Sequence, residues 1–150
     1  MERQNPVFIL VHGSLFTPSH YALLQHLLME SGYGVLSSLL PSSGVLDGAR
    51  GTLDDDAAYI RNRLVRPMLG NEARDVILLC HSAGALPGSA AVSGLSKPER
   101  GARPGVLGQI FIAPLLARGG DGSTMLGTAG GQLPERLRPD VSRSPAGQTV

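Results

Sequence analysis

Residues 76–84 read VILLCHSAG, a continuous apolar run that ends abruptly in small and polar residues. Such a run, with β-branched members, is typical of a strand buried on both faces of a parallel sheet. The small residues that follow in 84–92 predict a helix, and Pro87 is tolerated in its first turn. The segment therefore predicts a buried strand that passes through a tight turn at Ser82 directly into a helix.

The same alternation of strand and helix repeats on either side of this segment. Thr52 and the acidic residues behind it resemble a capping box, and Pro67 predicts the end of that helix. The predicted elements are strands 7–11, 35–40, 76–80 and 106–116 and helices 19–31, 52–66 and 84–92, the first helix with an apolar stripe of Tyr21, Leu24, Leu27 and Leu28. This order predicts an α/β fold, a three-layer sandwich with a doubly wound, mostly parallel sheet.

Composition predicts one domain and a tail. The chain has 150 residues, of which 42% are hydrophobic and 17% charged, as in ordinary globular proteins. We expect the core to occupy residues 1–117. Residues 118–150 are rich in Gly, Pro, Ser and Thr without apolar periodicity, which predicts a poorly ordered tail.

Charge and cysteine content exclude several classes of protein. The net charge is +1 and the basic residues form no stripe, so neither a nucleic acid nor an anionic membrane is expected as a partner. No targeting segment or membrane span is visible. The single cysteine, Cys80, excludes an internal disulfide, and the four histidines show no zinc spacing, so we expect a cytoplasmic protein without a metal or other cofactor.

Ser82 is the candidate nucleophile, because a tight turn between a strand and a helix thrusts a hydroxyl outward. The usual pattern is Gly-x-Ser-x-Gly; here Cys80 replaces the first glycine and Gly84 keeps the second. The N–H of Ala83, at the start of the helix, is a candidate oxyanion donor. The alternative is that Ser82 only caps the helix.

A second oxyanion donor is expected after the strand at 7–11, which ends in His12-Gly13-Ser14. Gly13 would let the backbone fold closely around a bound carbonyl and aim the Ser14 N–H at it. Alone, a glycine after a strand is usually only a turn residue. Both strand exits lie at the carboxyl ends of strands, where ligands bind in doubly wound sheets.

These motifs resemble the α/β-hydrolase superfamily, in particular small members related to plant methylesterases and hydroxynitrile lyases. The likeness covers about residues 6–116 and suggests a partial α/β-hydrolase fold, a C-terminally truncated member. It implies that Ser82 is the nucleophile, that Ser14 and Ala83 provide the oxyanion hole, and that four neighbours support the site: His12, Gly13, His81 and Gly84.

The sequence departs from this family in the rest of the triad. Family members place an acid and then a histidine after the nucleophile, whereas no histidine follows Ser82 here. Asp121 and Asp140 do follow it, and Asp121 reads more naturally as a turn residue in a Gly-rich loop. His81 should point away from the hydroxyl, while His20 and His26 belong to the first helix.

Two main functions remain open. The first is a serine hydrolase that cleaves a small ester or related acyl bond through a Ser82 acyl-enzyme. The second is a catalytically incomplete homologue that serves as a binding module or is a non-functional fragment. A nucleotide-binding domain is disfavoured because no phosphate-binding glycine motif is present. The hydrophobic strand 106–116 is an expected sheet edge, which predicts a homodimer through that edge.

Overall fold

The computed structural model describes residues 4–43, 45–46 and 49–116. Its centre is a parallel sheet in the order β2-β1-β5-β6. The strands are β1 (Val7–Val11), β2 (Gly34–Ser37), β5 (Val76–His81) and β6 (Val106–Ile112). The predicted α/β class and parallel sheet are confirmed.

β1 is an inner strand of the sheet, paired on both sides. All five of its residues are buried, as the apolar run predicted. Ile9 pairs with Leu36 of β2 on one side and with Leu78 of β5 on the other. Since β2 and β5 flank β1, the winding direction reverses there, which puts the carboxyl ends of β1 and β5 at a topological switch point.

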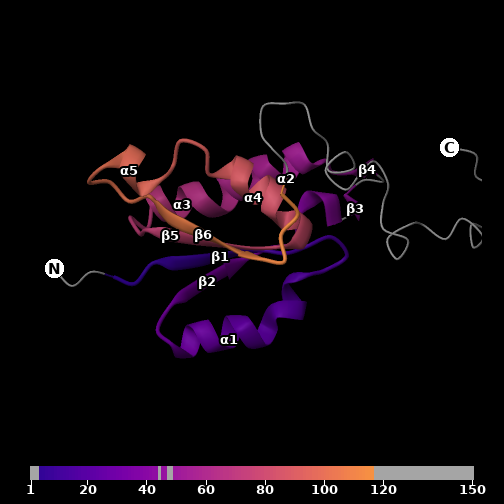
Figure 1. Ribbon diagram of the computed structural model, residues 1–150, viewed down its shortest axis with the longest axis horizontal. Coiled ribbons are helices and arrows are strands. Elements are labelled where there is room, and N and C mark those ends of the chain that lie inside the picture. The colour runs from indigo at the N-terminus through magenta and orange to yellow at the C-terminus, as the bar shows by residue number, and fades with distance from the viewer. Residues whose placement is uncertain (1–3, 44, 47–48, 117–150) are drawn as a thin grey trace, which may run out of the picture. The chain divides into compact units, whose positions relative to one another are not determined.

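Helices cover both faces of this sheet (Figure 1), which makes the three layers. On one face lie the 3-10 turn η1 (Pro18–Tyr21) and α1 (Ala22–Glu30). On the other face lie α2 (Leu53–Tyr59), the π-helix η3 (Ile60–Val65), α3 (Arg66–Gly70) and α4 (Ala85–Ala91).

The core has two parts, one on each side of the sheet. Ile9 and Val11 point to the larger part, beneath η3, α3 and α4, and Phe8 and Leu10 point to the smaller part beneath α1. The predicted stripe of α1 is partly wrong. Tyr21, Leu24 and Leu28 pack on the sheet, but Leu27 is 53% exposed, because at 3.6 residues per turn it lies roughly 100° around the helix from Leu28.

The helix that begins at Thr52 starts as predicted but ends later. The Thr52 hydroxyl accepts from the Asp55 N–H at 3.2 Å, and the Asp55 carboxylate accepts from the Thr52 N–H at 2.8 Å, which completes a capping box. Pro67 does not end the helix. In η3 the Arg66 N–H reaches back to the Arg61 carbonyl, so Pro67 falls in the first turn of α3, where its missing N–H costs nothing.

Two of the predicted strands extend further along the chain than the observed ones. The strand predicted over 35–40 ends at Ser37, and the one predicted over 106–116 ends at Ile112, where Ala113 takes a φ of +43° and Pro114 offers no N–H. Four short elements were not predicted: η2 (Pro41–Ser43), the antiparallel pair β3 (Val45–Leu46) and β4 (Ala49–Arg50), and α5 (Lys97–Arg100). They are too short to show a periodic pattern.

β6 is the edge of the described sheet on the β5 side. Leu107, Ile110 and Ile112 are 48%, 45% and 40% exposed, so apolar side chains on both faces of this strand meet solvent. Pairing with a second copy through β6 stays a prediction. Residues 117–150, with Asp121 and Asp140, lie outside the described residues, and so does the predicted tail. Among the described helices, none is long and apolar enough to cross a membrane.

Candidate active site

Ser82 stands at the turn between β5 and α4, in the 3-10 turn η4 (Ser82–Gly84). Its φ is +51°, in the left-handed region that a non-glycine residue adopts at a cost of about 1–3 kcal/mol. Its carbonyl accepts a hydrogen bond of 3.0 Å from the Leu115 N–H, which ties the segment after β6 to this turn. The strained turn is the one that the strand-to-helix pattern predicted.

Glycines allow the elements around this turn to approach closely. A Cβ placed on Gly84 would lie 2.4 Å from the His12 carbonyl oxygen, so only glycine lets η4 pack against the end of β1. A Cβ on Gly13 would lie 2.8 Å from His81 Nδ1 and 3.0 Å from Ser82 Cβ. The two strand exits identified in the sequence therefore meet.

Ser14 and Ala83 both line one small cavity beside this turn. Within residues 4–43, 45–46 and 49–116, neither amide donates to an acceptor in a turn, loop or side chain. Ala83 is buried and Ser14 is exposed. Two unengaged N–H groups at one cavity are able to bind a carbonyl oxygen or an oxyanion.

His12 is buried, and both of its ring nitrogens are engaged. Nε2 accepts from the Leu40 N–H at 3.1 Å, so Nδ1 carries the proton and donates to the Gly13 carbonyl at 2.9 Å. The ring is therefore neutral and joins the loop after β1 to the segment after β2. It supports the site and is not free to take a proton from Ser82.

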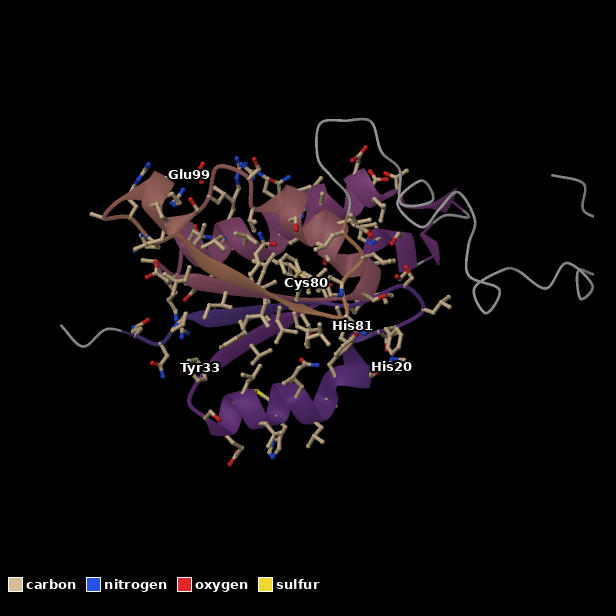
Figure 2. All side chains as sticks on the ribbon, viewed as in Figure 1. His20, Tyr33, Cys80, His81 and Glu99 are labelled. Carbon is tan, nitrogen blue, oxygen red and sulfur yellow. The ribbon has the colours of Figure 1, made fainter. Side chains whose placement is uncertain are left out.

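Tyr21 enters the site from η1, and sequence reasoning missed it. Its hydroxyl accepts from the Gly13 N–H at 3.2 Å and pairs with His81 Nδ1 at 2.7 Å. The Phe16 ring meets the His81 ring edge-on, with centroids 5.0 Å apart. In Figure 2, His81 and His20 lie near the same end of the molecule, whereas Tyr33 and Glu99 lie toward the other end, away from this group of rings.

A family model described as "Alpha/beta hydrolase family" matches residues 8–148. The chain belongs to the alpha/beta hydrolase family. This agrees with the resemblance drawn from the motifs and with the turn at Ser82.

A solved structure supports the fold of this hydrolase-family chain. The 2.75 Å crystal structure of an uncharacterized protein from Bacillus cereus ATCC 10987 is similar, with 17% sequence identity and a TM-score of 0.56. The similarity covers 77% of this chain and 36% of that protein, so the chain spans about a third of its relative's length. No curated protein matches the chain.

Among the described residues, no histidine is hydrogen-bonded to Ser82 as a general base would be. Across the part of the chain that the structure describes, the Ser82 hydroxyl makes no hydrogen bond. His20 Nδ1 accepts from the Thr17 N–H at 3.0 Å in its own turn, and His26 is exposed on α1. Nδ1 of His81 is occupied by Tyr21.

A buried carboxylate also lines the cavity, and sequence reasoning placed it only among the acidic residues of a helix start. Asp56 is 1% exposed and accepts from the Ser42 N–H at 2.8 Å and from the Ser42 hydroxyl at 2.6 Å. These bonds hold η2 against α2. The sequence signal for its burial is the spacing of four residues to Ile60, which places Asp56 on the buried face of this helix.

Cys80 is a core residue beneath the turn. It is fully buried, and burial raises the pKa of its thiol to about 12. The neutral thiol packs against Gly88 of α4 and is not a nucleophile. Among the residues that the structure describes, no three or more His, Cys, Asp or Glu side chains gather as metal ligands would.

Proposed function

We propose that Ser82 is the nucleophile of a serine hydrolase that cleaves a small ester or a related acyl bond. The observation that carries this proposal is the left-handed backbone of Ser82, which Gly84 and the His12 carbonyl hold in place beside the cavity. Ala113 and two other non-glycine residues, Leu15 and Ala73, also have a positive φ, but Ser82 combines it with a nucleophilic side chain at the end of a buried strand, and backbone strain clusters at active sites. A serine that only capped a helix would have no need of a positive φ.

The reaction begins when Ser82 Oγ attacks the substrate carbonyl carbon. A C–O bond forms, the carbonyl π electrons move to oxygen, and the N–H groups of Ser14 and Ala83 stabilise the oxyanion. Collapse expels the alcohol, which receives a proton, and leaves an acyl-Ser82. A water molecule then attacks this ester, releases the carboxylic acid and restores the serine hydroxyl.

The proton of Ser82 needs an acceptor during the first step, and no described side chain is bonded to it. Removal of a triad histidine leaves an oxyanion-hole enzyme with about 10³–10⁴-fold acceleration over water. We therefore expect Ser82 to be acylated at a rate well below that of a complete triad, with hydroxide or water taking the proton.

The test is covalent labelling with a fluorophosphonate probe, together with hydrolysis of p-nitrophenyl acetate. Wild type should label at one site, and Ser82→Ala should abolish the label, while Ser31→Ala, an exposed serine after α1, should not change it. Ser14→Pro removes an amide proton and should slow labelling about 10²–10³-fold. Labelling that survives Ser82→Ala contradicts the proposal.

A second candidate function is a binding module on the same cavity. It is favoured by the Ser82 hydroxyl, which has no hydrogen-bond partner among the described residues. If folded wild type takes no label and Ser82→Ala binds small esters with unchanged affinity in calorimetry, the binding function is supported. Under either function we propose that the ligand is a small ester-like molecule. We also propose a reducing, cytoplasmic compartment, in which the Cys80 thiol stays reduced.

A further inference from the structure

We propose that Tyr21 is a positioning residue of this site, whose hydroxyl holds the loop after β1 and the end of β5 at the spacing that brings the amides of Ser14 and Ala83 together. This inference rests on the proposed function of Ser82. It adds a residue from the opposite face of the sheet, on η1, to the groups that build the oxyanion hole.

The position of the Tyr21 hydroxyl in the chain connectivity carries the argument. One of its partners, the Gly13 N–H at 3.2 Å, directly precedes Ser14. The other, His81 Nδ1 at 2.7 Å, belongs to the residue directly before Ser82. A single oxygen therefore joins the backbone of Gly13 to the side chain of His81, and each of these residues stands within two positions of a proposed donor.

Both hydrogen bonds of the Tyr21 hydroxyl can form at the same time. The Gly13 N–H donates into a lone pair of the Tyr21 oxygen, which leaves the O–H proton free to donate to His81 Nδ1. His81 then carries its own proton on Nε2. Burial, partly offset by the Gly13 N–H, raises the pKa of Tyr21, so the hydroxyl keeps its proton throughout the neutral range.

The surroundings leave little room for another arrangement. The absent side chain of Gly13 makes space for His81 Nδ1, since a Cβ there would lie 2.8 Å from it. Phe16 lies against both rings, with centroids 5.0 Å from that of His81 and 6.0 Å from that of Tyr21. The imidazole is therefore held from two sides, and the tyrosine hydroxyl supplies its hydrogen bond.

The hydroxyl is separable from the packing of the Tyr21 ring. The ring packs on the smaller core part with Phe8, Leu10 and Leu79. Phenylalanine keeps this contact, so Tyr21→Phe removes only the link between the two backbone segments. A purely structural tyrosine would lose stability on this change without altering the chemistry at Ser82.

The test compares Tyr21→Phe, which loses the two hydrogen bonds of its hydroxyl, with Tyr59→Phe, a control variant that loses one tyrosine hydrogen bond. In Tyr59→Phe the lost bond, 2.8 Å to the Ser38 hydroxyl, involves neither Gly13 nor His81, and Tyr59 is half-buried like Tyr21. Both the rate of phosphonylation of Ser82 at saturating fluorophosphonate and the probe concentration for half-saturation are measured. We expect Tyr21→Phe to slow the saturated rate about tenfold without changing half-saturation, and Tyr59→Phe to change neither.

A second readout does not depend on reactivity. The imidazole ¹⁵N chemical shifts of His81 and the hydrogen exchange of the Gly13 amide report directly on the two hydrogen bonds of the Tyr21 hydroxyl, which we call the tether. We expect Tyr21→Phe to move both and Tyr59→Phe to move neither.

The two measurements separate failure of this inference from failure of the proposed function. Equal phosphonylation rates in the two variants, with wild type reactive, overturn the positioning role and leave the nucleophile intact. If wild type takes no label, the hydrolase proposal fails, and the tether is then judged by NMR alone. Unchanged His81 shifts and Gly13 exchange in Tyr21→Phe overturn it.

Discussion

Gly88 offers a sharp test of how α4 packs on β5. A Cβ at this position would lie 2.6 Å from the sulfur of Cys80, well short of the 3.4 Å at which ordinary contact begins. Its other neighbours, Leu78 Cδ2 at 3.6 Å and Val11 Cγ2 at 3.8 Å, are at comfortable distances. The conflict in Gly88→Ala is therefore with one atom, and Cys80→Ala removes that atom.

The magnitudes follow from opposing terms. Overpacking a buried contact costs about 1–3 kcal/mol, and replacing a helical glycine by alanine returns about 1 kcal/mol, so Gly88→Ala should destabilise by about 1 kcal/mol. Cys80→Ala loses one buried heavy atom and should cost about 1–1.5 kcal/mol. In the double variant the methyl group introduced by Gly88→Ala fills the space of the sulfur, so its stability should return to about that of wild type.

The assay is equilibrium unfolding in urea, followed by far-UV circular dichroism under reducing conditions, for wild type, both single variants and the double variant. We expect a favourable coupling free energy of about 2 kcal/mol with similar m-values. If the two single effects add to within about 0.5 kcal/mol, Gly88 and Cys80 are not in the contact described, and the reasoning about how α4 packs on β5 fails.

Two further predictions concern the same region. Gly84→Ala should destabilise by more than about 3 kcal/mol or prevent folding, because its Cβ would lie 2.4 Å from the backbone oxygen of His12, which cannot yield as a side chain would, whereas Gly70→Ala, with open space around it, should be neutral or stabilising in the same urea assay. Alkaline pH should weaken the fold: the Cys80 pKa rises from 9.0 unfolded to about 12 folded, so the stabilisation is complete below pH 9 and is lost between pH 9 and 12. The loss attributable to this thiol should be about 1.4 kcal/mol at pH 10, and an equal alkaline loss in Cys80→Ala would contradict that assignment.

The parts of this protein that sequence could predict are those specified by neighbouring residues. β1 was predicted to the residue, because an unbroken apolar run between polar residues has one stable placement in such a fold. The turn at Ser82 was predicted for a similar reason, since strand, serine and small residues stand together in the chain. The end of the Thr52 helix was missed because η3 absorbs Pro67 by a change of hydrogen-bond register that no local pattern announces.

The parts of the site that sequence could not predict depend on contacts between distant segments. Tyr21 looked like one more apolar position on a helix, and its role depends on where Gly13 and His81 come to lie. The burial of Asp56 likewise depends on Ser42, which reaches it from η2. Such contacts need the sheet order, and several strand orders are compatible with the same alternation of elements.

The sheet order also has a consequence for how the chain folds. β1 pairs with β2 through the short α1 crossover, but its other side waits for β5, which is made much later in the chain. Local pairings form first because closing a long loop costs more chain entropy. During synthesis, the unit of β1, α1 and β2 therefore emerges while the edge of β1 that will pair with β5 is still open to water. The turn at Ser82, built where β1 and β5 meet, cannot be completed before β5 has paired, so a partly folded chain presents an aggregation-prone strand edge without a formed site.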